Sequence, residues 1–210
     1  MKYFNNLPKI LNYDPVKKDY MAMTNLMVRT NLIPEILNNP MLYYTYDIKD
    51  SDTPELIAYK YYGTVDRFWL VLYSNQIIDP QWDWPMTSKL FESYISDKYA
   101  ADANTASMDV LSYTNATIDH YEKVVINTNL ATNNKLEQIV ILGEKEYTEL
   151  IESDVTVTVN GSQVRQQTIK KPVSIYDMEY KNNEKKRNIK LIDVKYANLI
   201  EEQFKTLMGN

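Results

Sequence analysis

The chain has 210 residues, enough to bury one large core or two smaller ones. A net charge of −5 offers no basic field for nucleic-acid phosphates, and the absence of cysteine excludes a disulfide framework and a cysteine-based zinc site. No apolar run approaches the roughly 20 residues that a membrane span needs. Residues 1–15 contain no long apolar stretch, so we expect no signal peptide. The absence of cysteine fits a chain that folds in a reducing cytoplasm.

The first part of the chain, residues 1–41, alternates short apolar clusters with Asn and Pro. We expect an extended N-terminal arm that packs on something else. Pro34 suits the first turn of a short helix near Ile33–Leu37. The aromatic and β-branched residues 42–48 then predict a strand.

Residues 52–75 predict two short helices joined by a tight turn. Thr53 or Asp52 can cap the first helix, and Gly63 can end it in the left-handed conformation. Asp66 can cap the second helix. The apolar residues that we expect to face inward are Leu56, Ile57, Phe68 and Leu72. The stretch QWDWP follows, and an extended backbone there would place Trp82 and Trp84 on one side.

The remainder of the chain predicts a third helix, a linker and then a mixture of strands and helices. Residues 87–99 have helical spacing, whereas 100–117 are small and polar and are read as the linker. Strands are expected at 121–126, 136–142 and 155–164, the last with a hairpin turn at Asn160-Gly161, followed by a polar helix at 174–188, a short strand at 189–194 and an amphipathic helix at 195–209. The fold class that these elements predict is α+β.

Residues arranged for catalysis are missing from the sequence. His120 is the only histidine, and no G-x-S-x-G nucleophile motif or glycine-rich phosphate loop accompanies it. Asp79 and Asp83 flank Trp82 in a way that could suggest a glycosidase, but Asp79-Pro80 is also a natural turn start. We therefore predict no catalytic residue, no cofactor and no metal site.

Residues 43–80 resemble a LysM module in their order of strand, helix, helix and extended segment. The matching residues are Asp52-Thr53, then Leu56, Ile57, Ala58, Tyr61 and Gly63, the second helix DRFWLVLYSN, and Asp79-Pro80. LysM modules usually begin with Gly-Asp-Thr, and this chain has Ser51 in place of the glycine. The resemblance implies binding of N-acetylglucosamine polymers, with Trp82 and Trp84 available to stack on sugar rings.

A longer resemblance covers roughly residues 1–99 and 174–208. The stretches YFNNLPKI, TYDIKDSDTPELIAYKYYGTVDRFWLVLYSNQIIDPQWDWPM and YKNNEKKRNIKLID look like the LysM-containing baseplate wedge protein of T-even-type contractile-tailed phages. This resemblance implies a structural subunit without enzymatic activity that clamps adjacent wedges around the hub of the virion's tail baseplate. It also implies assembly in the host cytoplasm in multiple copies around a six-fold ring. The implied partners are other wedge proteins and a sheath-initiator-like subunit, with no nucleic acid and no membrane.

The expected organisation is an N-terminal arm at 1–41, a LysM-like module with the following helix at 42–99, a linker at 100–117, and a β-rich segment at 118–210 that ends in helix–strand–helix. The candidate partner-binding residues are Tyr59, Tyr62, Trp69, Tyr73, Trp82, Trp84 and Phe204, the last from a stripe with Ala197, Ile200 and Leu207. Two alternatives stay open: both tryptophans could lie in the chain's own core, or the protein could bind peptidoglycan through its LysM module. A cell-wall binder usually has export signals and often repeated modules, and the sequence shows neither.

Overall fold

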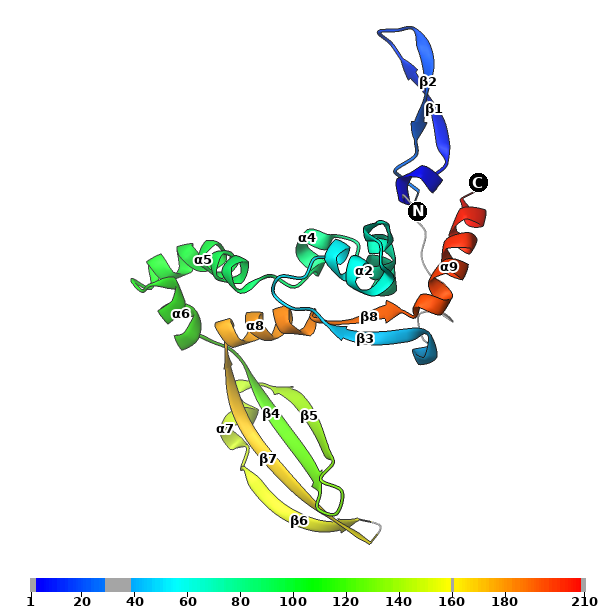
Figure 1. Cartoon of the computed structure of the whole chain (residues 1–210). Helices are drawn as coiled ribbons and strands as arrows, with labels where there is room; N and C mark the ends of the chain where they lie inside the picture. The colour runs from blue at the N-terminus through cyan, green and yellow to red at the C-terminus, as the bar shows by residue number, and fades with distance from the viewer. Residues whose placement is uncertain (1–2, 29–38, 160, 209–210) are drawn as a thin grey trace. The chain divides into compact units, whose positions relative to one another are not determined.

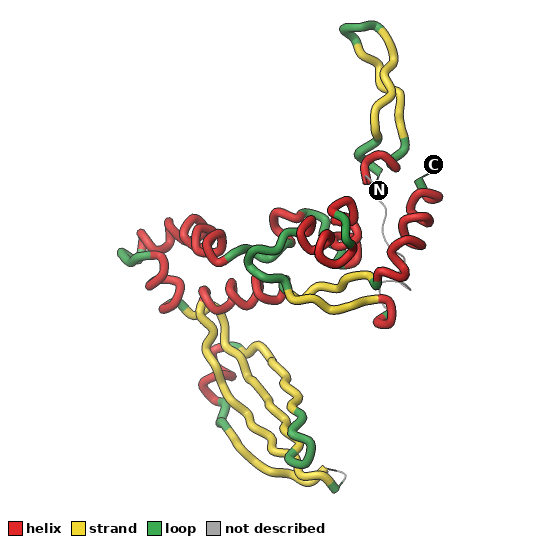
Figure 2. The backbone as a smooth tube through the Cα atoms, in the orientation of Figure 1, coloured by secondary structure: helices red, strands yellow, loops and turns green. Residues whose placement is uncertain are grey.

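The computed structural model describes residues 3–28, 39–159 and 161–208, and the chain divides into two compact units. Unit 1 comprises Met1–Thr87 together with Asn183–Asn210, and unit 2 comprises Ser88–Asn182. Unit 2 is therefore inserted into the sequence of unit 1. Both units mix helices and strands, which confirms the α+β class (Figures 1 and 2). The helix expected near Ile33–Leu37 lies outside the described residues.

The N-terminal part of unit 1 is a hairpin, whereas the sequence predicted an extended arm. After the short 3-10 helix η1 (Tyr3–Asn6), strands β1 (Lys9–Asp14) and β2 (Asp19–Thr24) pair antiparallel. The reason is the turn between them. The Asp14 carboxylate accepts hydrogen bonds from the backbone of Val16 and Lys17, at 2.9 and 3.2 Å, and Lys18 adopts a positive φ of 51°.

The two helices of unit 1 begin and end where local residues predict. In helix α2 (Pro54–Tyr62) the Thr53 hydroxyl accepts from the Leu56 backbone at 3.2 Å, and Gly63 ends the helix with φ of 73°. The next turn, η3 (Val65–Arg67), is capped by Thr64 and not by Asp66; it leads into helix α3 (Phe68–Ser74).

The strand beside β3 (Tyr43–Asp47) comes from the far end of the chain. It is β8 (Asn188–Ile192), which pairs antiparallel with β3 from Tyr43↔Ile192 to Asp47↔Asn188. The sequence had predicted an extended segment directly after the second helix, and that segment does not pair with β3. Strand β8 supplies three buried apolar side chains to the core, Ile189, Leu191 and Ile192, which residues 77–84 cannot match.

The core of unit 1 differs from the predicted one in its details. Ile57 is buried as expected, but Leu56 is 37% exposed, and Phe68 and Leu72 are only half-buried. Their place is taken by other residues of the same two helices: Ala58, Trp69, Leu70 and Val71. Helix α3 therefore turns the face that carries Trp69 towards the core.

Aromatic rings join three distant segments of unit 1. Phe204 of the C-terminal helix α9 (Val194–Leu207) lies 4.9 Å from Trp69 and 5.3 Å from Tyr3, ring centre to ring centre. The Tyr3 and Tyr73 hydroxyls are 2.9 Å apart. Of the predicted stripe on α9, Ala197, Ile200 and Phe204 are buried, and Leu207 is 75% exposed. Helix α9 thus packs on the core of its own unit.

Unit 2 combines helices with a four-stranded antiparallel sheet of order β5-β4-β7-β6. The strands are β4 (Ile118–Asn129), β5 (Lys135–Leu142), β6 (Ser153–Val159) and β7 (Ser162–Ser174). The helices are α5 (Ser88–Thr105), α6 (Val110–Ala116), α7 (Glu144–Glu149) and α8 (Ile175–Lys185), whose last residues belong to unit 1. The strands predicted at 121–126 and 136–142 lie within β4 and β5. The strand predicted at 155–164 is divided between β6, which ends at Val159, and β7, which begins at Ser162. Asn160 lies outside the described residues.

The predicted linker at 100–117 is instead mostly helical. Helix α5 continues to Thr105 because Ala103 is buried, and the Asp109 carboxylate caps α6 by accepting from the Ser112 backbone at 3.0 Å. Thr114, on α6, is fully buried. The small residues of 100–117, which suggested a linker in the sequence, instead lie where helices pack closely. Within the described ranges, no helix has both the length and the apolar character to cross a membrane.

Replacing Phe204 with alanine should lower the free energy of unfolding by about 3–5 kcal/mol, because the ring is buried against Tyr3 and Trp69. Leu207→Ala on the same helix removes a largely exposed side chain and should change stability by less than about 0.5 kcal/mol. Urea unfolding followed by tryptophan fluorescence measures both. Equal losses in the two variants would contradict this packing of α9.

Candidate partner interface

The structure places the seven candidate partner-binding residues in different environments. Tyr62, Trp69 and Phe204 are buried, and Tyr73 and Trp84 are half-buried against the same core. Tyr59 and Trp82 are exposed, by 60% and 54%. The expectation that Tyr62 and Trp69 lie on the outer surface is therefore wrong. The Tyr62 hydroxyl donates to the Ile192 carbonyl at 3.0 Å, which explains how a polar tip is accommodated inside.

The stretch QWDWP does not form a two-tryptophan platform. Residues Pro80–Asp83 form a short helix, α4, because the Asp79 carboxylate accepts from the Gln81 backbone at 3.0 Å and Pro80 occupies the first turn. Trp82 is exposed, whereas the Trp84 indole N–H donates to the Asp52 carbonyl at 3.1 Å and its ring packs on the core. Asp79-Pro80 was visible in the sequence as a turn start, and the turn proved to be helical.

Asp52 holds together the loop that precedes α2. Its fully buried carboxylate accepts from Lys60 Nζ at 2.6 Å, from the Tyr46 hydroxyl at 2.7 Å and from the Lys49 backbone at 3.1 Å. Burial alone would raise the pKa of Asp52, but the hydrogen bonds from Lys60, Tyr46 and Lys49 outweigh it and hold that pKa below its ordinary value. The hydrogen bond to Asp52 in turn raises the pKa of Tyr46 to about 12. The loop is thereby fixed to both β3 and α2.

Arg187 fastens the same loop from the other side. Its guanidinium donates to Asp50 at 2.7 Å and to the Ile48 carbonyl at 3.3 Å, and its own carbonyl accepts from the Ile48 backbone at 2.9 Å. Nearby, the Asn183 side chain makes two hydrogen bonds to the Met86 backbone, at 2.7 and 3.1 Å. The polar groups of residues 48–53 are thus largely engaged by the chain itself.

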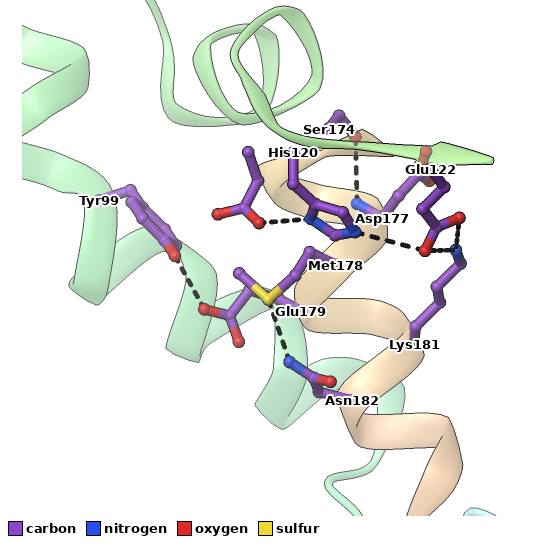
Figure 3. Close-up of polar contacts among 10 residues, drawn as sticks. Tyr99, His120, Glu122, Ser174, Asp177, Met178, Glu179, Lys181 and Asn182 are labelled. Atoms are coloured by element: carbon purple, nitrogen blue, oxygen red, sulfur yellow. Dashed lines mark hydrogen bonds and ion pairs between the residues drawn. The ribbon is translucent and has the colours of Figure 1, made fainter. Parts of the chain in front are cut away.

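The single histidine belongs to a cluster of polar and charged side chains in unit 2 (Figure 3). His120 Nδ1 lies 2.7 Å from Asp119 Oδ2, and Nε2 lies 3.3 Å from Glu122 Oε1. Lys181 Nζ donates to both carboxylate oxygens of Glu122, at 3.0 and 2.9 Å. Burial raises the pKa of Glu122, but the contacts with Lys181 and His120 outweigh it and hold the pKa below its ordinary value.

The geometry of this cluster is that of a structural link between strand β4 and helix α8. The Ser174 hydroxyl, drawn in the same view, accepts from the Asp177 backbone at 3.1 Å and so caps α8 (Figure 3). Glu179, on the same helix, accepts from Lys98 at 2.5 Å and from the Tyr99 hydroxyl at 2.8 Å. In the part of the chain that the structure describes, no group of three or more His, Cys, Asp or Glu side chains could hold a metal ion.

Sequence reasoning missed one exposed apolar surface of unit 1, the hairpin β1–β2. All of its strand residues except Asp14 are exposed. Leu11, Tyr13 and Tyr20 share one face and Ile10, Met21 and Met23 the other, with exposed fractions between 42% and 72%. The short apolar clusters of residues 1–41 were visible in the sequence, but the pairing of two of these segments was not predicted.

Comparison with known protein families gives one match across most of the chain. Residues 17–207 match the family described as base plate wedge protein 53. The match includes strand β2 of the hairpin, the whole of unit 2 and helix α9. Comparison with curated proteins gave no match.

The two tryptophans of QWDWP should respond differently to truncation. Trp84→Ala should destabilise the protein by about 2–3 kcal/mol, because it removes core packing and the hydrogen bond to Asp52. Trp82→Ala should change the free energy of unfolding by less than about 0.5 kcal/mol. Chemical denaturation of the two variants gives the comparison, and a larger loss for Trp82→Ala would contradict the placement of both rings.

Asp52→Asn should destabilise the protein at neutral pH by about 1–3 kcal/mol, because a buried charged acceptor is replaced by a neutral amide. A carboxyl whose folded-state pKa is depressed stabilises the fold above its ordinary pKa of 3.8, and that contribution is lost as pH falls through the folded-state pKa. The difference between wild type and Asp52→Asn should therefore shrink below about pH 4. Urea unfolding at a series of pH values measures it. A difference that grows on acidification would show that the sign is wrong.

Proposed function

The chain belongs to the base plate wedge protein 53 family, and on this premise we propose that it clamps neighbouring wedges of a phage tail baseplate together around the hub. Membership of the family makes it a structural component of the baseplate in the virion's tail. The clamp is a more specific role. It needs surfaces that bind other proteins and that are held by a rigid scaffold.

The hairpin β1–β2 is the observation that carries this proposal. An isolated two-stranded hairpin is at best marginally stable in water, because it has no core of its own. Here the hairpin exposes apolar side chains on both faces, including Leu11 and Tyr20 on one and Met21 and Met23 on the other. A partner that covers both faces would bury this surface, as a groove between two protein subunits can. The partners that cover the hairpin in this proposal are other wedge proteins.

Further contacts would come from exposed aromatic residues on the folded part of unit 1. Tyr59 and Trp82 are the two candidate residues that stay available on its surface, and large aromatic side chains are favoured at protein interfaces. The proposed partners also include a sheath-initiator-like subunit. In a six-fold ring, assembled in the host cytoplasm, one such clamp would act identically at each wedge boundary.

Binding of N-acetylglucosamine polymers is the alternative that a LysM-like module raises. Sugar recognition needs polar groups free to bind hydroxyls, and here Asp52, Ile48 and Asp50 are engaged by the chain itself. Trp84, one of the two rings proposed to stack on a sugar, packs on the core. These observations favour a module that binds protein over one that binds sugar.

The double variant Tyr13→Ser/Tyr20→Ser tests the role of the hairpin. The two rings lie 5.4 Å apart across the strands, and their loss should reduce incorporation into tail particles about tenfold or more while leaving the unfolding transition of the isolated chain unchanged. Ile151→Ser, which changes an 84% exposed residue of unit 2, serves as the control and should assemble normally. Quantitative mass spectrometry of purified tails provides the readout. Normal incorporation of the hairpin variant would rule out this role.

The same wild-type chain should neither bind nor cleave chitin oligomers or peptidoglycan fragments. Calorimetric titration and product analysis measure binding and cleavage. Tight binding that is lost in Trp82→Ala would favour the sugar-binding alternative. Cleavage that survives purification and is lost in Asp83→Asn would show that the chain is an enzyme.

A further inference from the structure

A hollow of about 270 Å³ lies between helices α5, α6 and α8 of unit 2. Its interior is apolar, because Ile95 is buried and Val110 and Tyr176 are half-buried. Leu111 is 57% exposed, so the apolar surface continues outward from the hollow. The residues that line it are Glu92, Ile95 and Ser96 of α5, Val110 and Leu111 of α6, and Tyr176 of α8.

The walls of the hollow are held in place by regular packing. The Tyr176 ring lies edge-on to the buried ring of Phe91, with 5.6 Å between the ring centres. Helix α6 is capped by Asp109, and its Thr114 is fully buried, with the hydroxyl donating to the Val110 carbonyl at 2.9 Å. A ligand would therefore meet a hollow that is already formed, as is usual for binding sites.

The rim of the hollow carries a negative charge that the chain does not neutralise. Glu92 is exposed, and among the described residues its carboxylate forms no ion pair or hydrogen bond, not even with Lys89 one turn earlier on α5. Within the same ranges, the hydroxyls of Ser96 and Tyr176 are not hydrogen-bonded either. An anionic group and two hydroxyls thus stand beside an apolar interior.

We propose that this hollow binds a segment of a neighbouring protein that inserts one bulky apolar side chain and pairs an adjacent arginine or lysine with Glu92. The volume of about 270 Å³ is below the roughly 300–1,000 Å³ of small-molecule sites and suits a single anchoring side chain. The exposed Leu111 extends the contact beyond the hollow, as a protein partner requires.

The unpaired carboxylate determines the charge of that partner. A cation beside the anchor would be attracted to Glu92, and complementary charges at an interface favour the correct partner and register. Arginine suits this position best, because its planar guanidinium can bind both oxygens of a carboxylate. That the partner is another baseplate protein rests on the function proposed above. The hairpin β1–β2 belongs to unit 1 and the hollow to unit 2, so each contact can be disrupted separately.

Photo-crosslinking in assembled tails tests which chemistry occupies the hollow. Ser96 is replaced in the full chain by the photo-crosslinker p-benzoylphenylalanine, and the cross-linked peptide from purified tails is sequenced by mass spectrometry. We expect a segment of another baseplate protein that has arginine or lysine within four positions of a bulky apolar residue. The same photo-crosslinker at Ile151, which is 84% exposed and does not line the hollow, should not label that segment.

Charge reversal tests the ion pair. Glu92→Arg should reduce incorporation into tails about tenfold or more, and reversing the partner's basic residue to glutamate should restore it. Leu111→Ser, which removes the exposed apolar contact, should also reduce incorporation. Glu149→Arg makes the same charge change at an exposed residue of α7 and should incorporate normally. The unfolding transition of each isolated variant should match that of the wild type, because all three side chains are largely exposed.

Three results would overturn the proposal: normal incorporation of both Glu92→Arg and Leu111→Ser, a cross-link from position 96 to a segment without a basic residue, and the absence of any protein cross-link from that position. The last result would indicate that solvent or a small molecule fills the hollow. Normal incorporation of these variants together with loss of Tyr13→Ser/Tyr20→Ser would exclude the hollow from assembly and leave the clamp intact.

Discussion

Strands β3 and β8 lie side by side although Asp47 and Asn188, which are hydrogen-bonded at 2.8 Å, are 141 positions apart in the sequence. Without β8, the core beneath α2 and α3 would lose Ile189, Leu191 and Ile192. Strand β8 also positions α9, since Asp193 donates its backbone N–H to the Leu42 carbonyl at 2.8 Å and caps the helix with its carboxylate. The aromatic contacts of Phe204, and the ion pair between Arg67 and Glu201, follow from that position. A single long-range ladder therefore closes unit 1.

Features that depend on a few neighbouring residues could be predicted from the sequence. The capping of α2 by Thr53 with Pro54 behind it, and its end at Gly63, require only local geometry. The alternation of Val and Thr in β6 likewise predicts a strand, because the side-chain period of a strand is two. Of the candidate interface residues, Tyr59 and Trp82 are exposed, although the sequence placed Trp82 in an extended stretch and left a core position open for it.

Features that depend on packing between distant segments could not be predicted. Trp69 and Phe204 are as suitable for an interface as for a core, and only the meeting of α3 with α9 decides between the two. Residues 100–117 lack a clear apolar stripe because Ala103 and Thr114 use small side chains to let helices approach closely. The partner of β3 could not be identified either, because strand pairing across an inserted unit leaves no local pattern in either strand.

The insertion of unit 2 into unit 1 also determines when unit 1 can form during translation. Strand β8 and helix α9 leave the ribosome only after all of unit 2 has been synthesised. Closing a long open loop is entropically unfavourable. Once unit 2 has folded, only the short gap between Met86 and Asn183 has to be closed, and there the Asn183 side chain is hydrogen-bonded to the Met86 backbone. A nascent chain that stalls within unit 2 therefore exposes α2 and α3 without their strand partner, and it is recognisable to chaperones and proteases as incomplete.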